Sequence, residues 1–429
     1  MRPSPLRLAF VTCALLYAAD AQAQTLSSLI NDLFTYGNCG QPLCLVLTGP
    51  DSIHQGHFIP AVTQGSRSVL GFLSQSIGRS TANLPISATS SGATFKIVDG
   101  LPVKTSTSAG PIFAERSQTL GRNRFFVGAN VSGISFTSLN GAPTGDLRFN
   151  FSHKNVGDSA LGSPSIENDL ISTDLSLSVE QQVATIFATW GILDFVDIGV
   201  AVPLVRTSLS GYSFSQITPF GDSAVHRFAG DLANPVLEAS KSLAGSASGI
   251  GDMAARLKVN LGQNDKFGAA ILTDIRLPTG KEADFLGTGS TSIRAQGILG
   301  AQFGNFAPHL NAGYAARTDT LQNDAILGTI GFDALVAEWA TVAGEFITEW
   351  QLGANKISQP GPIDLTVPFA REYPSTSIPD KRQNVMNMAL GAKFTVRGGM
   401  VIVINGLVPI KKSGLQPDIA WTAGLEYTF

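Results

Sequence analysis

The chain ends in the stretch Pro417-Asp418-Ile419-Ala420-Trp421-Thr422-Ala423-Gly424-Leu425-Glu426-Tyr427-Thr428-Phe429. Apolar and polar side chains alternate along it, and a period of two is the signature of a β-strand with one apolar and one polar face. The stretch is about as long as a tilted strand must be to cross a membrane. It therefore predicts a membrane-spanning strand, with an amphipathic strand of a soluble sheet as the alternative.

Composition favours the membrane. Only 14% of the 429 residues are charged and 45 are glycine, whereas a soluble protein usually carries charge on about a quarter of its residues. A helical membrane protein needs unbroken apolar runs of about 18 residues, and the sequence contains none. The net charge of −3 gives no electrostatic case for nucleic acid. We expect an all-β protein, a transmembrane antiparallel β-barrel in contact with the lipid and lipopolysaccharide of the bacterial outer membrane.

The N-terminus has the three parts of a secretory signal. Arg2 and Arg7 supply positive charge, residues 8–19 form an apolar core too short to span a membrane, and Ala21-Gln22-Ala23 is a small-x-small cleavage site. Residues 1–23 are therefore expected to be removed as a signal peptide.

Residues 24–91 do not alternate and form a segment of their own. Residues 26–34 read as a short amphipathic helix, and residues 62–77 are a candidate for a second one. Cys39 and Cys44 lie close together in an exported chain, which predicts a disulfide between them. Because the segment is too apolar for a linker, we expect it to plug the barrel, with a position beneath the barrel in the periplasm as the alternative.

Alternating segments dominate residues 92–429, which are assigned to the barrel. Short turns alternate with longer connections, and outer-membrane barrels place tight turns in the periplasm and long loops outside. Single-chain barrels have even strand numbers, so residues 93–98 are added as a fourteenth strand to thirteen clear ones. Twelve strands follow instead if two segments within residues 92–154 are not part of the wall. The clear segments are 124–136, 144–154, 170–190, 194–210, 250–261, 266–278, 291–303, 305–317, 325–336, 339–350, 384–397, 399–410 and 417–429.

Polar side chains on these strands are expected to face the lumen. Because both signs of charge are present, we favour salt bridges that only stabilise a narrow barrel, with a polar pathway or contacts that hold a plug as the alternative. Pro203 lacks an N–H and cannot complete its strand ladder, so we expect a kink there, and a lateral opening is a further hypothesis. The lumen-lining candidates are Asp252, Arg256, Lys258, Asp274, Arg276, Arg294, His309, Glu345, Glu349, Lys393, Arg397 and Glu426.

No motif predicts an enzyme, a cofactor or a metal site. Leu277-Pro278-Thr279-Gly280-Lys281-Glu282 lacks the first glycine and the Ser or Thr of a phosphate-binding loop. His54 and His57 have the spacing of metal ligands but lie among Gly and Pro, so we favour two loop histidines over a loop metal site. Some outer-membrane barrels are hydrolases with a Ser–His pair, for which this sequence has no local signature.

Several strand-and-turn stretches resemble one family of outer-membrane barrels. They are residues 121–141, 182–191, 200–205, 248–252, 276–280 and 286–290. Together they are similar to the MetA-pathway of phenol degradation family, over about residues 115–320 and the closing strand. The resemblance implies an outer-membrane channel or transporter for small aromatic or other hydrophobic compounds. Barrels that transport long-chain fatty acids and hydrocarbons are also similar, in strand number and in an N-terminal plug.

The C-terminal residues also resemble those of outer-membrane barrels. A final Phe429 with Tyr427 two residues before it is what the barrel-assembly machinery reads in such proteins, so these two residues are the candidate assembly signal.

The sequence thus predicts passive uptake of small hydrophobic or aromatic solutes. Nothing near the start of the mature chain resembles a box for energy coupling. A porin-like diffusion channel for polar solutes is the first alternative, and a structural or enzymatic barrel is the second. A transporter of hydrophobic solutes should have an occluded lumen with an apolar pocket, whereas a porin should conduct ions.

Overall fold

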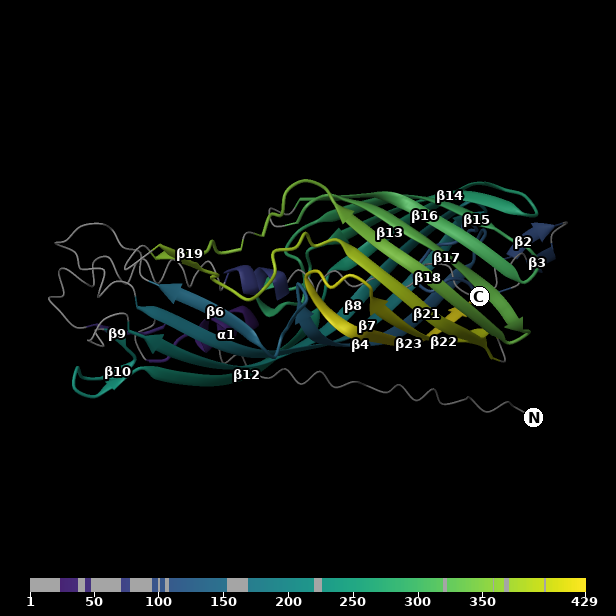
Figure 1. Cartoon of the computed structure of the whole chain (residues 1–429). Helices are drawn as coiled ribbons and strands as arrows, with labels where there is room; N and C mark the ends of the chain where they lie inside the picture. Colours follow the sequence, from purple (N-terminus) through teal and green to yellow (C-terminus); the bar gives the residue numbers. More distant parts are fainter. Residues whose placement is uncertain are drawn as a thin grey trace, which may run out of the picture.

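The computed structural model describes residues 24–37, 43–47, 71–77, 95–98, 101–104, 108–152, 169–219, 226–318, 322–357, 359–365, 370–396 and 399–429. Within them, twelve antiparallel strands close into a barrel (Figure 1). The wall strands are β4 (Phe125–Leu139), β7 (Leu170–Leu193), β8 (Val196–Thr218), β13 (Met253–Gln263), β14 (Phe267–Leu277), β15 (Ser292–Ala301), β16 (Phe306–Arg317), β17 (Ala325–Ala337), β18 (Ala340–Gln351), β21 (Val385–Thr395), β22 (Met400–Pro409) and β23 (Leu415–Thr428).

The C-terminal stretch is confirmed as the closing strand. β23 pairs with β4, and Phe125 and Phe429 exchange both backbone hydrogen bonds, at 2.8 and 2.9 Å. The rings of Phe125 and Phe429 are stacked with centroids 5.7 Å apart, and Tyr427 stacks on Phe429 at 5.7 Å. The last residue of the chain is therefore part of the seam itself.

Deleting Phe429 is expected to weaken this seam. The deletion removes two backbone hydrogen bonds and two ring contacts, each of which contributes about 1 kcal/mol. We expect a severalfold smaller fraction of folded, heat-modifiable barrel on unheated gels of outer membranes. Ile419→Ala, on the lipid-facing side of the same strand, is the control. An undiminished folded fraction for the deletion would contradict this role of Phe429.

The wall has the alternative count of twelve strands and not the preferred fourteen. Two segments assigned to the wall find partners elsewhere. β2 (Phe95–Val98) pairs with β3 (Leu101–Lys104) in a separate two-stranded sheet. β6 (Leu147–Ser152) pairs with β7 over Leu170–Leu175, beyond the part of β7 that pairs with β4.

The two faces of the wall differ as lipid requires. Ile186, Leu257 and Ile330 are 57%, 45% and 60% exposed on the outer face, whereas Asn130 and Asn405 are buried in the interior. Lipid offers no hydrogen-bond partners to the backbone. A β-sheet that exposes an apolar face to lipid must therefore close into a barrel, which leaves no unpaired strand edge. No helix in the described ranges is long and apolar enough to cross a membrane.

Exposed aromatic side chains gather at the end of the barrel that carries the C-terminus and the short turns. Such girdles mark the lipid–water boundary of outer-membrane barrels. The fold is therefore that of a bacterial outer-membrane β-barrel, a class in which the short turns face the periplasm. The girdle residues are Phe125, Trp190, Phe195, Phe267, Phe303, Phe306, Trp339, Tyr427 and Phe429.

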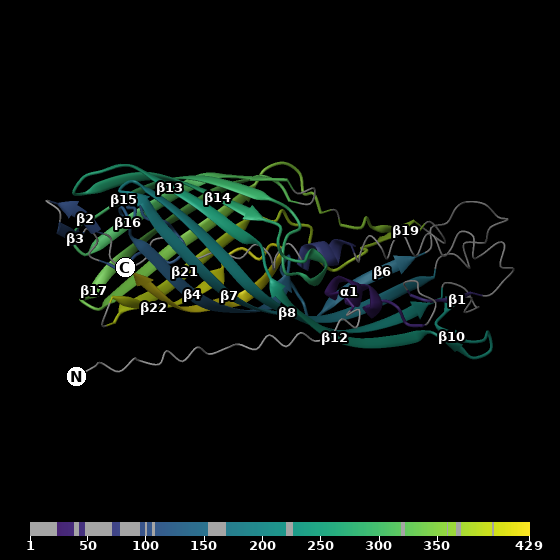
Figure 2. The same cartoon turned by 180° about the vertical axis from the view of Figure 1, so that it is seen from behind.

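At the opposite, outer end, β7 and β8 continue beyond the ring (Figure 2). β6 pairs with the extension of β7, and β12 (Glu238–Ile250) pairs with the extension of β8. These four extended segments are called the outer sheet. The remaining short elements are β1 (Val46–Leu47), β5 (Ala142–Pro143), β9 (His226–Arg227), β10 (Ala229–Gly230), β11 (Pro235–Val236), η1 (Glu282–Asp284), β19 (Ile363–Leu365) and β20 (Arg371–Tyr373).

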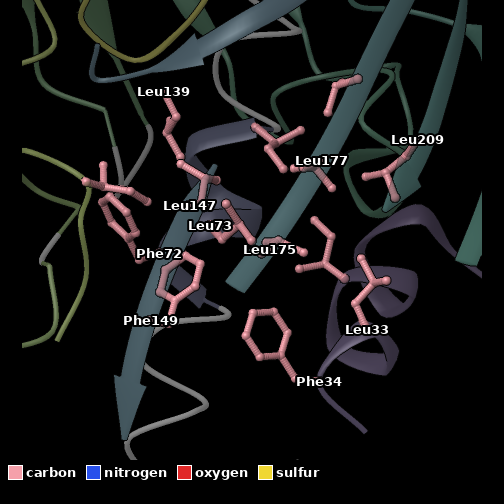
Figure 3. Packing of buried hydrophobic residues seen from close by; sticks show 14 of the residues in the cluster. Leu33, Phe34, Phe72, Leu73, Leu139, Leu147, Phe149, Leu175, Leu177 and Leu209 are labelled. Atoms are coloured by element: carbon pink, nitrogen blue, oxygen red, sulfur yellow. The ribbon is translucent and has the colours of Figure 1, made fainter. Parts of the chain in front are cut away.

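The N-terminal residues pack against the outer sheet. α1 (Leu26–Leu33) is capped by Thr25, whose hydroxyl accepts a hydrogen bond from the Ser28 N–H, and its apolar side is buried against β8 and β12. Residues 71–77 are also helical, and Figure 3 shows Phe72 and Leu73 beside Phe149 of β6. The described parts of residues 24–91 thus lie at the outer end, and the chain inside the lumen is a different stretch, residues 108–120.

Some of the expectations concern residues outside the described ranges. The signal peptide, residues 1–23, is one of them. Cys44 is disulfide-bonded, but its expected partner Cys39 lies outside these ranges, so the pairing stays a prediction.

Phe34→Ala is expected to loosen the N-terminal residues from the outer sheet. Phe34 is fully buried and meets the rings of Phe149 and Phe151 edge-on, at 5.7 and 6.2 Å. Truncating a buried Phe costs about 3–5 kcal/mol. We expect limited proteolysis within residues 24–91 to be at least tenfold faster, because a loss of about 1.4 kcal/mol in packing free energy raises the population of the detached state tenfold. The barrel should stay resistant. Leu232→Ala, at a side chain 53% exposed, is the control, and equal cleavage rates would contradict the packing role.

Candidate functional site

A stretch of chain passes through the barrel interior. Residues 108–120, called the lumen segment, precede the first wall strand and contact inward-facing side chains of β8, β13, β17 and β18. Glu345 of β18 is the main contact, and its carboxylate accepts backbone hydrogen bonds from Ile112 (2.6 Å), Phe113 (3.0 Å) and Ala114 (3.1 Å). One buried carboxylate therefore holds three consecutive N–H groups of the segment.

Charged contacts hold the lumen segment on its C-terminal side as well. Arg116 lies 3.2 Å from Asp333 of β17 and donates a hydrogen bond to the carbonyl of Ser108 at 2.9 Å. The Leu120 N–H contacts both carboxylate oxygens of Asp197 on β8, at 3.0 and 3.1 Å. Removing one partner of such a buried pair is costly because it leaves the other charge uncompensated. The segment is therefore an ordered part of the interior.

Glu115 links the lumen segment to β13. Its carboxylate oxygens lie 3.4 Å from Arg256 Nη1 and 3.4 Å from Lys258 Nζ. The side chain of Asn311 on β16 donates a hydrogen bond to the Glu115 carbonyl at 3.3 Å. Five wall strands, β8, β13, β16, β17 and β18, thus contribute side chains that bind this one stretch.

A cavity of about 210 Å³ lies between the lumen segment and the outer connections of the barrel. Phe113, Ala114 and Glu115 line it on one side, and Ser413 and Gly414, in the outer connection between β22 and β23, line it on the other. A hydrocarbon-lined cavity of about 150 Å³ is large enough to bind benzene. The cavity therefore has room for one aromatic ring with a small substituent.

One wall of the cavity is mostly apolar, with Ser132, Gln416 and Thr422 as its polar residues. It is formed by neighbouring strands, β4, β23 and β22. The apolar side chains on these strands are Ile134, Phe136, Leu407, Leu415, Pro417 and Ala420. These side chains suit a poorly water-soluble solute, because each Å² of apolar surface removed from water contributes about 25 cal/mol to the free energy of binding.

The wall across the cavity is charged. Arg256, Asp274 and Arg294 lie side by side on β13, β14 and β15, in one row of cross-strand pairs. Asp274 lies 2.7 Å from Arg256 and 3.5 Å from Arg276. From β15 the ring runs through β16, β17, β18, β21 and β22 to β23, which is six steps in a ring of twelve. The charged wall therefore stands opposite the apolar one.

Predicted lumen residues lie in three places in the described interior. Those that line the cavity are Arg256, Asp274, Arg276, Arg294 and Glu349. Those that contact the lumen segment, or lie beside its carboxylate partners, are Lys258, Glu345 and His309, the last at 3.6 Å from Asp333 and 3.9 Å from Glu345. Lys393 and Glu426 form a separate buried pair, 3.5 Å apart.

Two predicted lumen residues do not join this group. Asp252 lies between β12 and β13, where its carboxylate accepts hydrogen bonds from the backbone N–H groups of Gly280 (3.0 Å) and Thr288 (2.7 Å). It fastens the loop between β14 and β15 to the wall. Arg397 lies outside the described residues.

Sequence reasoning missed Glu115, Arg116, Asp333 and Arg317. Arg317 lies on β16 and Asp333 on β17, and both segments alternate in the sequence. The alternation therefore predicts that both side chains face the lumen. Glu115 and Arg116 lie in the lumen segment, which has no periodicity to mark it.

Pro203 lies where β8 changes partner. Ala201 pairs with Ala254 of β13, whereas Leu204 pairs with Ile250 of β12. The hydrogen-bond ladder along this edge of β8 is interrupted where the partner changes from β13 to β12. A proline, which has no N–H to donate, is tolerated at such an interruption. A lateral opening at Pro203 stays a hypothesis.

A second interruption of the ladder borders the cavity directly. Between β23 and β4 the register passes from the pair Pro417–Phe136 to the pair Ala420–Ile134. All four residues line the cavity, so the interruption lies in its apolar wall.

The described part of the chain holds no group of three or more His, Cys, Asp or Glu side chains arranged to hold a metal ion. His54 and His57, the loop pair considered from the sequence, lie outside the described residues.

Several solved barrels are similar to this one in structure. The COG4313 outer membrane channel from Pseudomonas putida F1 is 11% identical, with a TM-score of 0.42, over 73% of this chain and 98% of that one. A Pseudomonas aeruginosa FadL homologue is 10% identical, with a TM-score of 0.32, over 71% and 89%. The deltaS2S3 mutant of the TodX monoaromatic hydrocarbon channel is 10% identical, with a TM-score of 0.29, over 73% and 90%.

No protein-family model and no curated protein matches the sequence. The expected membership of the phenol-degradation family is therefore not confirmed. Structural likeness at these identities and scores carries no conclusion about what passes through this barrel, which has to be argued from its own interior.

Proposed function

We propose that the protein is an outer-membrane channel for passive uptake of small hydrophobic or aromatic compounds. The observation that carries the proposal is the cavity of about 210 Å³ in the lumen, with its apolar wall on β4, β22 and β23. Lipopolysaccharide slows apolar solutes at the outer membrane, so a protein path that offers apolar contacts has a use. Movement would follow the concentration gradient.

The lumen segment supports this proposal over a porin-like channel for polar solutes. It crosses the interior and is fastened by buried carboxylates on β8, β17 and β18. A water-filled pore needs an unobstructed polar lumen. An apolar solute that enters and leaves the cavity needs only brief local movements of the lumen segment.

Uptake into whole cells tests the proposal. Cells expressing the protein and cells with empty vector are given labelled toluene, phenol or a small sugar, and initial uptake is measured. We expect faster uptake of toluene and phenol and no change for the sugar. Equal acceleration of the sugar would indicate a porin, and no change for any solute would indicate a structural or enzymatic barrel.

A further inference from the structure

Six charged side chains line the cavity. Three are cations, Arg256, Arg276 and Arg294, and three are anions, Glu115, Asp274 and Glu349. Lys258 and Arg317, which do not line it, also lie within ion-pair distance of Glu115 and Glu349.

Each of the three acids lies within ion-pair distance of at least one cation. Asp274 is 2.7 Å from Arg256, and Glu349 is 2.7 Å from Arg317. Glu115 is 3.4 Å from both Arg256 and Lys258. Within the described ranges, the ion pairs of these three acids are therefore all formed with cations other than Arg294.

Arg294 is the lining cation that takes no part in these ion pairs. It lines the cavity, yet within the described ranges it forms no ion pair or hydrogen bond, and its buried Nε has no partner. Its cross-strand neighbours are Asp274, already bound by Arg256, and Ala315, which has no polar side chain. A buried donor without a partner is costly, and the partly buried guanidinium presents a planar set of donors that suits a carboxylate.

We propose that the cavity binds small amphipathic monoanions, such as an aromatic carboxylate, with the carboxylate at Arg294 and the ring against the apolar wall. This inference rests on the proposed function and narrows its solute class. Arg294 on β15 faces the cavity from the wall opposite Leu415 and Pro417 on β23. The volume of about 210 Å³ exceeds the roughly 150 Å³ that holds benzene, which leaves room for the carboxylate.

Benzoate and benzamide test the inference, because they have nearly the same shape and differ in charge. Their binding to the purified barrel in detergent is measured by titration calorimetry. We expect benzoate to bind about tenfold more tightly than benzamide, since a hydrogen bond to a charged group is stronger than one to a neutral group. In Arg294→Gln the two affinities should become equal, and in Arg294→Lys a preference for benzoate should persist. Arg122→Gln, at an exposed arginine, should behave as wild type.

The outcomes separate this inference from the proposed function. If wild type binds both compounds equally, or if Arg294→Gln keeps the preference, Arg294 is not an anion site, while faster toluene uptake by cells would still support the channel. If toluene uptake is not accelerated in cells, the proposed function fails whatever the calorimetry gives. Heat-modifiable migration of each variant confirms that it is folded.

Discussion

Replacing Glu345 by alanine is expected to raise the ion conductance of the reconstituted barrel by about tenfold or more. The substitution removes the acceptor of three backbone hydrogen bonds from Ile112, Phe113 and Ala114. Each hydrogen bond to a charged group contributes about 1.5–3 kcal/mol. Without them, the lumen segment should leave the interior for a large fraction of the time, and ions should pass.

Planar-bilayer recordings measure this effect directly. Wild type should show small, infrequent openings, and Glu345→Ala large or long-lived ones. Glu338→Ala lies in the exposed turn of the same β17–β18 hairpin and is the matched control. If correctly folded Glu345→Ala protein conducts no better than wild type, the lumen segment does not obstruct the pore.

Replacing Leu407 by tryptophan is expected to remove most of the protein's acceleration of toluene uptake. Leu407 is buried, 6% exposed, in the apolar wall of the cavity. The larger side chain would occupy space that the solute needs in a cavity of only about 210 Å³. We expect uptake to fall by about tenfold, as for a loss of about 1.4 kcal/mol in solute binding.

The control for this substitution lies on the other face of the wall. Leu425→Trp, on the neighbouring strand β23, makes the same change at a lipid-facing side chain that is 50% exposed, and its uptake should match wild type. Uptake that survives Leu407→Trp unchanged would show that toluene does not pass through this cavity.

The barrel could be predicted from the sequence because its signal is local. Strict alternation in β23 and β14 reports which face meets lipid and which meets the lumen. The outer sheet also has a signal in the sequence, the length of its two longest strands. β7 is 24 residues long and β8 is 23, about twice what a membrane requires of a strand, so each had to extend beyond the bilayer.

The lumen segment could not be predicted in this way. Its position depends on Glu345, more than 230 residues further along the chain from Ile112, and on Asp197 and Asp333 from two other strands. No periodicity within residues 108–120 reports such contacts. The strand count was uncertain for a related reason, since β2 and β6 alternate like wall strands but pair outside the ring.

The central claim is that an apolar solute occupies the cavity inside the barrel. Crystals of the protein soaked in bromobenzene, measured at the bromine absorption edge, test it most directly. We predict an anomalous peak in the lumen between Phe113, Ile134 and Leu407, which line the cavity. Anomalous peaks only on the lipid-facing surface, with none in the lumen at saturating bromobenzene, would contradict the claim.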